Sequence, residues 1–187
     1  MMWDHSIFLW LNFDGGAFMD GLMSLVSGKV TWLPLYLFLL FLVWRKGGWR
    51  SVGLFVLCVI VAVGLSDIVA GIFKHSGPLK HAWESFPTRL RPMHTPELEG
   101  LIHKIGGGGR YGTVSAHAAT TTSVALISAL TLRRRYLTIV LTVWVLAVSY
   151  SRIYLAFHFP QDILLGWFVG IVCALPPYLL YRRSAKK

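Results

Sequence analysis

Residues 136–181 read YLTIVLTVWVLAVSYSRIYLAFHFPQDILLGWFVGIVCALPPYLLY. Two long apolar stretches, 136–155 and 160–181, are separated here by a connection of only four residues. A helix needs about 20 apolar residues to cross the hydrocarbon core of a bilayer, and both stretches reach that length. The segment therefore predicts two consecutive transmembrane helices joined by a short connection.

Three further apolar stretches precede this pair, at residues 30–44, 51–73 and 113–132. The first has only 15 residues, so we expect it to start earlier or to tilt. Charged residues make up 14% of the 187-residue chain, against about 25% in an average soluble protein. The sequence predicts one all-α domain over residues 1–187, an integral membrane bundle of five to six transmembrane helices.

Residues 3–28 are apolar but interrupted by polar side chains, among them Asp4, Asn12, Asp14 and Asp20. We interpret this segment as one or two short helices lying at the membrane interface. A sixth transmembrane helix is the alternative.

Many of the basic residues gather in connections that lie on one side of the predicted transmembrane bundle. Three connections hold ten lysines and arginines and no acidic residue: Arg45, Lys46 and Arg50; Arg133, Arg134 and Arg135; and Arg182, Arg183, Lys186 and Lys187. With five helices these connections lie on one side, which the positive-inside rule assigns to the cytoplasm. The net charge of +10 is thus explained by membrane topology, and no nucleic-acid partner is expected.

All seven histidines fall on the opposite side, together with a long loop at residues 75–112. Histidine titrates near neutral pH and carries protons in catalysis, so this side is the expected location of a site. Within the loop, residues 106–109 are four glycines, which we interpret as a flexible link, with an anion-binding nest as the alternative.

The connection between the last two helices carries Arg152, His158 and Asp162. An arginine within a transmembrane helix costs about 2.5–3.5 kcal/mol unless it is paired or reaches the interface, so Arg152 is a functional candidate. Asp162 follows His158 by one helical turn, a spacing at which its carboxylate can accept the imidazole N–H and leave the other nitrogen free to attack.

Arginines and a second histidine are expected on the same side of the membrane. Arg89 and Arg91 lie in the long loop, and His117 lies at the start of the third long stretch. Phosphoryl transfer needs cations for the phosphate oxygens, a nucleophile and an acid for the leaving oxygen. Arg89 is equally well interpreted as a solvated charge.

These residues resemble the three motifs of the type 2 phosphatidic-acid phosphatase superfamily, which also includes vanadium haloperoxidases. The third motif, SRxxxxxHxxxD, is matched at every position by Ser151, Arg152, His158 and Asp162. The second, a PSGH-like element, is present as residues 114–117, VSAH, with alanine in place of glycine.

The first motif, KxxxxxxRP, departs most from the family. Arg91 and Pro92 are present, but Glu84 stands seven residues before Arg91. We favour Lys74 as the motif lysine, with Lys80 as the alternative.

The resemblance implies roles for individual residues. His158 would form a phosphohistidine oriented by Asp162, and His117 would protonate the leaving group and then activate water. The phosphate would be held by Arg91, Arg152, Lys74, Ser115 and the backbone N–H of Ala116. Neither a metal nor another cofactor is expected.

We therefore predict a membrane lipid phosphatase in the bacterial inner membrane, with its site facing the periplasm or the exterior. Undecaprenyl diphosphate is the favoured substrate, followed by phosphatidylglycerophosphate, phosphatidic acid and lipid A. The alternatives are a haloperoxidase, a proton-coupled transporter and an inactive lipid-binding relative. The oligomeric state is left open.

Overall fold

The computed structural model describes residues 2–74 and 89–184, and in these residues the regular structure is helical. The α-helices are α1 (Met2–Leu11), α2 (Gly16–Ser27), α3 (Leu33–Ile72), α5 (Ala116–Leu132), α6 (Arg135–Tyr154) and α7 (Pro160–Ser184), and the 3₁₀ turns are η1 (Val30–Trp32), η2 (Pro92–His94) and η3 (Pro96–Leu98). The all-α prediction is confirmed.

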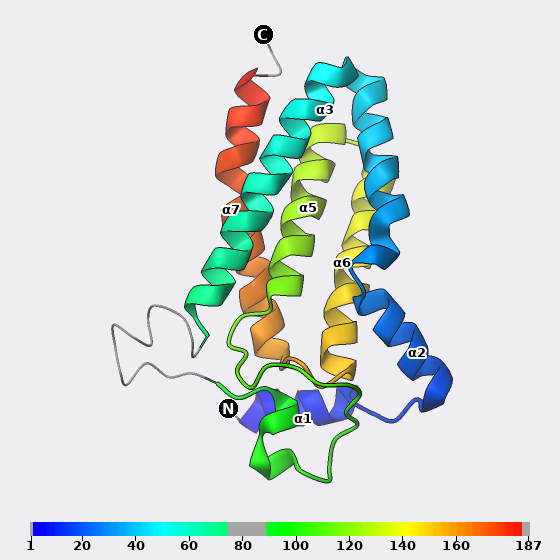
Figure 1. The fold of residues 1–187 in the computed structure, drawn as a ribbon, viewed down its shortest axis with the longest axis vertical. Helices are drawn as coiled ribbons and strands as arrows, with labels where there is room; N and C mark the ends of the chain where they lie inside the picture. The colour runs from blue at the N-terminus through cyan, green and yellow to red at the C-terminus, as the bar shows by residue number, and fades with distance from the viewer. Residues whose placement is uncertain (1, 75–88, 185–187) are drawn as a thin grey trace.

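Helix α3 combines the first two apolar stretches of the sequence. Its helical backbone is broken at Gly47 and Gly48, and Gly48 has a left-handed φ of 68°, which glycine adopts without steric cost. The chain reverses there, so residues 33–46 and 49–72 form two antiparallel arms (Figure 1). The first arm begins only at Leu33, preceded by the 3₁₀ turn η1.

The two arms of α3 run along the long axis of the molecule with α5, α6 and α7 (Figure 1). Three helices of the described chain are long and apolar enough to cross a membrane, namely Val30–Ile72, Arg135–Tyr154 and Pro160–Ser184. Helix α5 has 17 residues, at the lower end of the range of about 17–25 for a span. Large apolar side chains such as Ile60, Ile68, Val143 and Phe168 are exposed on the bundle. The protein is therefore an integral membrane protein.

Helices α5 and α7 pack closely because α7 carries glycine at two positions of the contact. A Cβ on Gly166 would lie 2.7 Å from the Ser115 carbonyl oxygen, and one on Gly170 would lie 2.4 Å from the Ala119 carbonyl oxygen. Small residues four apart allow two transmembrane helices to approach at backbone distance. This packing fixes the start of α5 against the start of α7.

The two ends of the bundle differ in charge and in content. The bend of α3, the α5–α6 connection and the end of α7 lie at one end (Figure 1), where the Lys46 Nζ donates to the Thr131 carbonyl oxygen at 2.6 Å. The basic residues of the three connections that the structure describes, up to Arg183, are therefore at the same end. The opposite end holds α1, the described part of the long loop and the first turns of α5 and α7.

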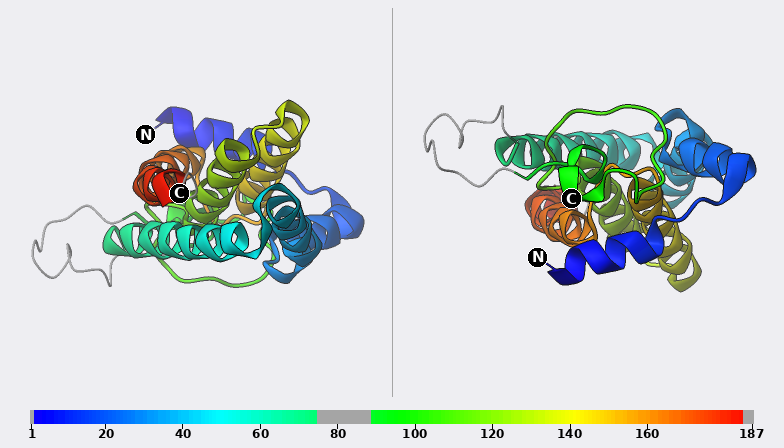
Figure 2. Two further views of the ribbon diagram at one scale, coloured as in Figure 1. Left: turned by 90° about the horizontal axis from the view of Figure 1, so that it is seen from above. Right: turned by 90° about the horizontal axis from the view of Figure 1, so that it is seen from below.

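The N-terminal segment forms two short helices. Helix α1 has 10 residues and α2 has 12, so neither is long enough to span a bilayer. Helix α1 lies across the end of the bundle, and α2 leads from it to the first arm of α3 (Figures 1 and 2). Two short helices are what the interfacial interpretation expects, and the choice between that placement and a sixth span stays a prediction.

Candidate active site

His158 lies in the tight connection between α6 and α7. Ala156 takes a left-handed φ of 56°, and the turn directs the N–H groups of both Phe157 and His158 to the Arg152 carbonyl oxygen, at 2.9 and 3.2 Å. The His158 Nδ1 lies 3.2 Å from the Asp162 Oδ2. A carboxylate accepts, so Nδ1 carries the proton and Nε2 is left available for attack.

The His158–Asp162 pair is almost completely buried, with 3% and 1% of the two residues exposed. Burial, reinforced by the positive charges of Arg91 and Arg152, lowers the pKa of His158 well below its ordinary value. The imidazole is consequently neutral at neutral pH, which is the protonation state that a nucleophile requires.

The second motif lies at the N-terminus of α5. Ser115 is the N-cap, and its Oγ accepts from the Ala118 N–H at 3.3 Å. The Ser115 N–H donates to the Asp162 carbonyl oxygen at 3.0 Å, which ties the second motif to the third. Ala116 is the first residue of α5, and N–H groups in the first turn of a helix lack intrahelical partners and suit an anion.

Arg152 is a buried cation with few partners. Only 8% of the residue is exposed, its Nη1 donates to the Ser27 hydroxyl, and its guanidinium lies 4.1 Å from the centre of the Phe157 ring. Its Nε has no hydrogen-bond partner within the described chain. A buried donor left unpaired is costly, so this side chain suits a ligand that supplies acceptors.

Arg91 approaches the same aromatic ring from the long loop. Its Nε donates to the Tyr111 carbonyl oxygen at 3.2 Å, its guanidinium lies 5.7 Å from the Phe157 ring centre, and burial lowers its pKa. Among residues 2–74 and 89–184, no carboxylate forms an ion pair with Arg91 or Arg152. Two partly desolvated cations without a carboxylate between them can hold an anion.

The glycine-rich segment and the residues that follow it, 106–112, form part of the site wall, since a Cβ on Gly108 would lie 2.6 Å from the Arg91 Nη1. The Arg91 N–H donates to the Arg110 carbonyl at 3.0 Å and the Gly112 N–H to the Arg89 carbonyl at 2.9 Å, so the two ends of the described loop pair. A Cβ on Gly112 would lie 3.1 Å from the His158 Cε1. The interpretation as a flexible link misses this role, because only the folded loop reveals the close approach.

The two candidates for the motif lysine differ in what the structure shows. Lys74 follows α3, and its charge acts on both His158 and His117. Lys80 and Glu84 lie outside the described residues, so this choice stays a prediction. The roles of the other site residues also stay predictions, although the structure brings His117, His158, Asp162, Arg91, Arg152, Ser115 and Ala116 together at one end of the bundle.

A cavity of about 600 Å³ adjoins the site. Its polar residues include Lys29, Asp67 and His117. Its remaining lining is mainly apolar and comes from the two arms of α3 and from α5, including Leu39, Phe55, Val59, Ile60 and Val124. The cavity is therefore lined by polar residues around His117 and by apolar residues between the transmembrane helices.

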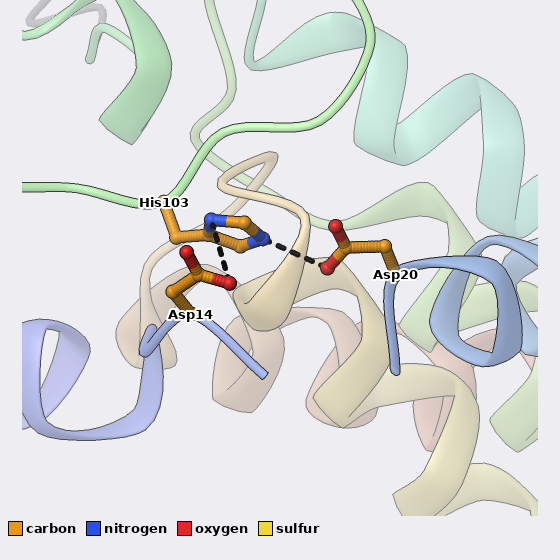
Figure 3. Close-up of side chains that lie close together, drawn as sticks. All are labelled: Asp14, Asp20 and His103. Atoms are coloured by element: carbon orange, nitrogen blue, oxygen red, sulfur yellow. Dashed lines mark hydrogen bonds and ion pairs between the residues drawn. The ribbon is translucent and has the colours of Figure 1, made fainter. Parts of the chain in front are cut away.

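A second polar cluster holds the long loop in place (Figure 3). The His103 Nε2 lies 2.8 Å from the Asp20 Oδ1 and its Nδ1 lies 3.8 Å from the Asp14 Oδ1. Hydrogen bonds from Tyr154 and His103 lower the pKa of Asp20. The Asn12 side chain accepts from the His103 N–H at 2.9 Å and donates to the His103 carbonyl at 2.8 Å. These bonds fasten the loop to the N-terminal segment and to the end of α6.

Comparison with known proteins identifies the family of the chain. The sequence profile of the PAP2 superfamily matches residues 54–186. The chain belongs to the PAP2 superfamily. A protein named lipid A 4'-phosphatase from Bacteroides thetaiotaomicron is 31% identical over 89% of this chain and 72% of its own length. A protein of the same name from Porphyromonas gingivalis is 30% identical over 95% of this chain and 72% of its own.

Two further comparisons have lower sequence identity. An undecaprenyl-diphosphatase from Sulfolobus acidocaldarius is 23% identical over 88% of this chain and 71% of its own. The crystal structure of Aquifex aeolicus LpxE superposes with a TM-score of 0.62 at 18% identity, covering 95% of this chain and 93% of that one, which shows the shared fold. The sequence relatives are named as phosphatases, and this chain is a membrane lipid phosphatase of the PAP2 type.

Proposed function

We propose that this enzyme removes a phosphate monoester from a lipid A-type glycolipid by transferring the phosphoryl group to His158. The two relatives at 30–31% identity are named lipid A 4'-phosphatase, whereas the relative named undecaprenyl-diphosphatase is 23% identical. This order favours a glycolipid phosphate over undecaprenyl diphosphate as the substrate.

One observation carries the proposal more than any other. A neutral imidazole, fixed through Nδ1 by Asp162, is located beside two arginines that have no ion-paired carboxylate in the described chain. A phosphate would bring the missing negative charge and the missing acceptors, including one for the Arg152 Nε.

The proposed reaction has two steps. The His158 Nε2 attacks phosphorus, the bond from phosphorus to the lipid oxygen breaks, and His117 protonates that oxygen. His117 then accepts a proton from water as the water oxygen attacks phosphorus, which breaks the N–P bond and releases inorganic phosphate. Arg91, Arg152, Lys74, the Ser115 hydroxyl and the Ala116 N–H neutralise or hydrogen-bond the phosphoryl oxygens in both steps.

The cavity between the α3 arms and α5 supports an amphiphilic substrate. His117 is among its lining residues, and most of its lining is apolar and comes from transmembrane helices. A lipid tail placed there would present its phosphorylated head group to His158.

We further propose that the enzyme is located in the bacterial inner membrane with the site facing the periplasm. The basic connections lie at the opposite end of the bundle, which the positive-inside rule assigns to the cytoplasm. The substrate would then reach the site from the outer leaflet of this membrane.

The test is phosphate release by purified protein in detergent with EDTA present. The substrates are lipid A bearing a 4'-phosphate, undecaprenyl diphosphate, phosphatidic acid and phosphatidylglycerophosphate. We expect release from lipid A that resists the chelator, is lost in His158→Ala and is kept in the control His94→Gln, which changes an exposed histidine of the long loop. Equal release by His158→Ala would refute the mechanism, and preferential release from undecaprenyl diphosphate would refute the substrate.

A further inference from the structure

Asp4, in the first turn of α1, is fully buried although it belongs to a short helix outside the bundle. Both of its carboxylate oxygens are used. Oδ2 forms an ion pair with the Arg89 Nη2, and Oδ1 accepts the Gln161 N–H at 3.0 Å. A buried carboxylate is costly to maintain unless it is paired, so this arrangement is a specific feature of the fold.

Arg89 bridges two buried carboxylates. Its Nη1 lies 3.3 Å from the Asp162 Oδ1, while its Nη2 holds Asp4. Its guanidinium lies 3.8 Å from the centre of the Phe159 ring, which is itself buried. The planar group is thus held by contacts from α1, from the α6–α7 connection and from α7.

Asp162 is consequently bound on both oxygens. Its Oδ2 accepts from the His158 Nδ1 at 3.2 Å and from the Phe159 N–H at 3.1 Å, and its Oδ1 accepts from Arg89. An unbroken chain of contacts therefore runs from α1 through Asp4, Arg89 and Asp162 to the nucleophile.

The charges of this chain explain why a second carboxylate is useful. An opposite charge favours the ionised form of a carboxyl group, so Arg89 favours the carboxylate form of Asp162. With Asp4 included, the two carboxylates and one guanidinium sum to −1, so a negative charge remains beside an imidazole that gains positive charge as its Nε2 bonds to phosphorus.

We propose that Asp4 and Arg89 are positioning residues for the phosphatase reaction, which hold Asp162 in place and, together with it, keep a net negative charge beside His158. Helix α1 is then a component of the active site and not only an interfacial anchor. This inference rests on the proposed function, because it assigns these two residues to the same nucleophile.

The experiment compares kcat and KM for Asp4→Asn, Asp4→Glu, Arg89→Gln and the double variant Asp4→Asn/Arg89→Gln, using the same lipid phosphate. Neither residue is proposed to touch substrate, so KM should be nearly unchanged. We expect kcat to fall about 10- to 100-fold, which is the typical loss when the hydrogen-bond partner of a metal-bound histidine is removed. The double variant should be no slower than Arg89→Gln, since the residues act as one unit. Asp4→Glu, which keeps the charge, should recover part of the loss.

Two controls change charge near the loop without touching this chain of contacts. Glu99→Gln removes an exposed carboxylate and Lys104→Gln an exposed ammonium group, and both should keep the wild-type kcat. A second readout does not depend on turnover. In protein labelled with ¹⁵N-histidine, the Nδ1–H resonance of His158 should shift in Asp4→Asn and remain unshifted in Glu99→Gln.

The outcomes separate the two proposals. A wild-type kcat in Asp4→Asn, equal activity of Asp4→Asn and Asp4→Glu, or an unshifted His158 resonance would each overturn the positioning role. If wild-type protein released phosphate from no lipid, the proposed function would fail. The resonance in Asp4→Asn would still decide whether Asp4 acts on His158.

Discussion

At His158, burial and neighbouring charge act in the same direction. The side chain is nearly inaccessible, and the cations Arg91 and Arg152 oppose its protonation, so the pKa of His158 lies well below 6.5. The single proton of the neutral ring is assigned to Nδ1 by the contact with Asp162. The residue is therefore prepared for attack through Nε2 before any substrate arrives.

This protonation state leads to a prediction about pH. In the free enzyme, the His158 imidazole should stay neutral as the pH falls through 6.5, because a lowered pKa means that protonation begins only at more acidic pH. The measurement is the ¹⁵N chemical shift of the ring, with the resonance assigned by its loss in His158→Ala. A ring that becomes protonated around pH 6.5 or above would show that burial does not govern it.

Individual site residues differ in how far the sequence predicts them. The pairing of His158 with Asp162 follows from a spacing of four, which is a local property of a helix start. Asp4 and Gly112 have no such local signal. Asp4 meets Arg89 across 85 positions, and Gly112 meets His158 only when the loop has folded, so their roles depend on tertiary structure.

At the scale of elements, the segment of residues 106–112 packs closely against Arg91 and His158. Gly112→Ala would place a Cβ about 3.0 Å from the Arg91 Cγ and 3.1 Å from the His158 Cε1, tighter than ordinary contact. We expect the overpacking to cost about 1–3 kcal/mol of free energy. Because the displaced groups are Arg91 and His158, kcat/KM should fall about tenfold or more. Steady-state assays would measure it.

Gly109→Ala is the matched control for this change. A Cβ on Gly109 meets nothing within 4 Å, so this variant should keep its kcat/KM. Equal activity of the two variants would mean that the loop does not pack on His158 as described.

The α5–α7 contact gives a separate prediction about stability. Gly170→Ala would bring a Cβ to 2.4 Å from a backbone oxygen of α5, so the helices would have to separate. We expect a loss of about 1–3 kcal/mol in the free energy of unfolding, measured as a lower Tm in detergent. Gly64→Ala, in an open position of α3, should leave Tm unchanged or raise it. A Tm unaffected by Gly170→Ala would contradict the close packing.

The helices themselves are largely predictable from hydropathy. Each of the five apolar stretches of the sequence forms a helix or an arm of α3, because a long apolar segment in a bilayer must satisfy its backbone within itself. Hydropathy does not encode side-chain packing between distant segments. Such packing sets the 3.8 Å contact between Arg89 and the Phe159 ring and the placement of α1 across the bundle.

For the whole molecule, the separation of the basic end from the site end predicts topology. We expect a single cysteine introduced as Glu99→Cys to react with a membrane-impermeant maleimide on intact spheroplasts, and one introduced as Arg134→Cys to react only after lysis. Both positions are exposed in the structure. The variants would be made with Cys58→Ala and Cys173→Ala, which remove the two native cysteines. The reverse labelling pattern would place the site in the cytoplasm.

The central claim is that the phosphoryl group passes through His158, and trapping that intermediate tests it most directly. Wild-type protein would be mixed with ³²P-labelled lipid A 4'-phosphate, quenched in alkali within the first turnover, and digested for mass spectrometry. The account predicts a label that is stable in alkali and lost in acid, on the peptide containing His158, and absent from His158→Ala. Phosphate release without any labelled histidine, or a label retained in His158→Ala, would contradict it.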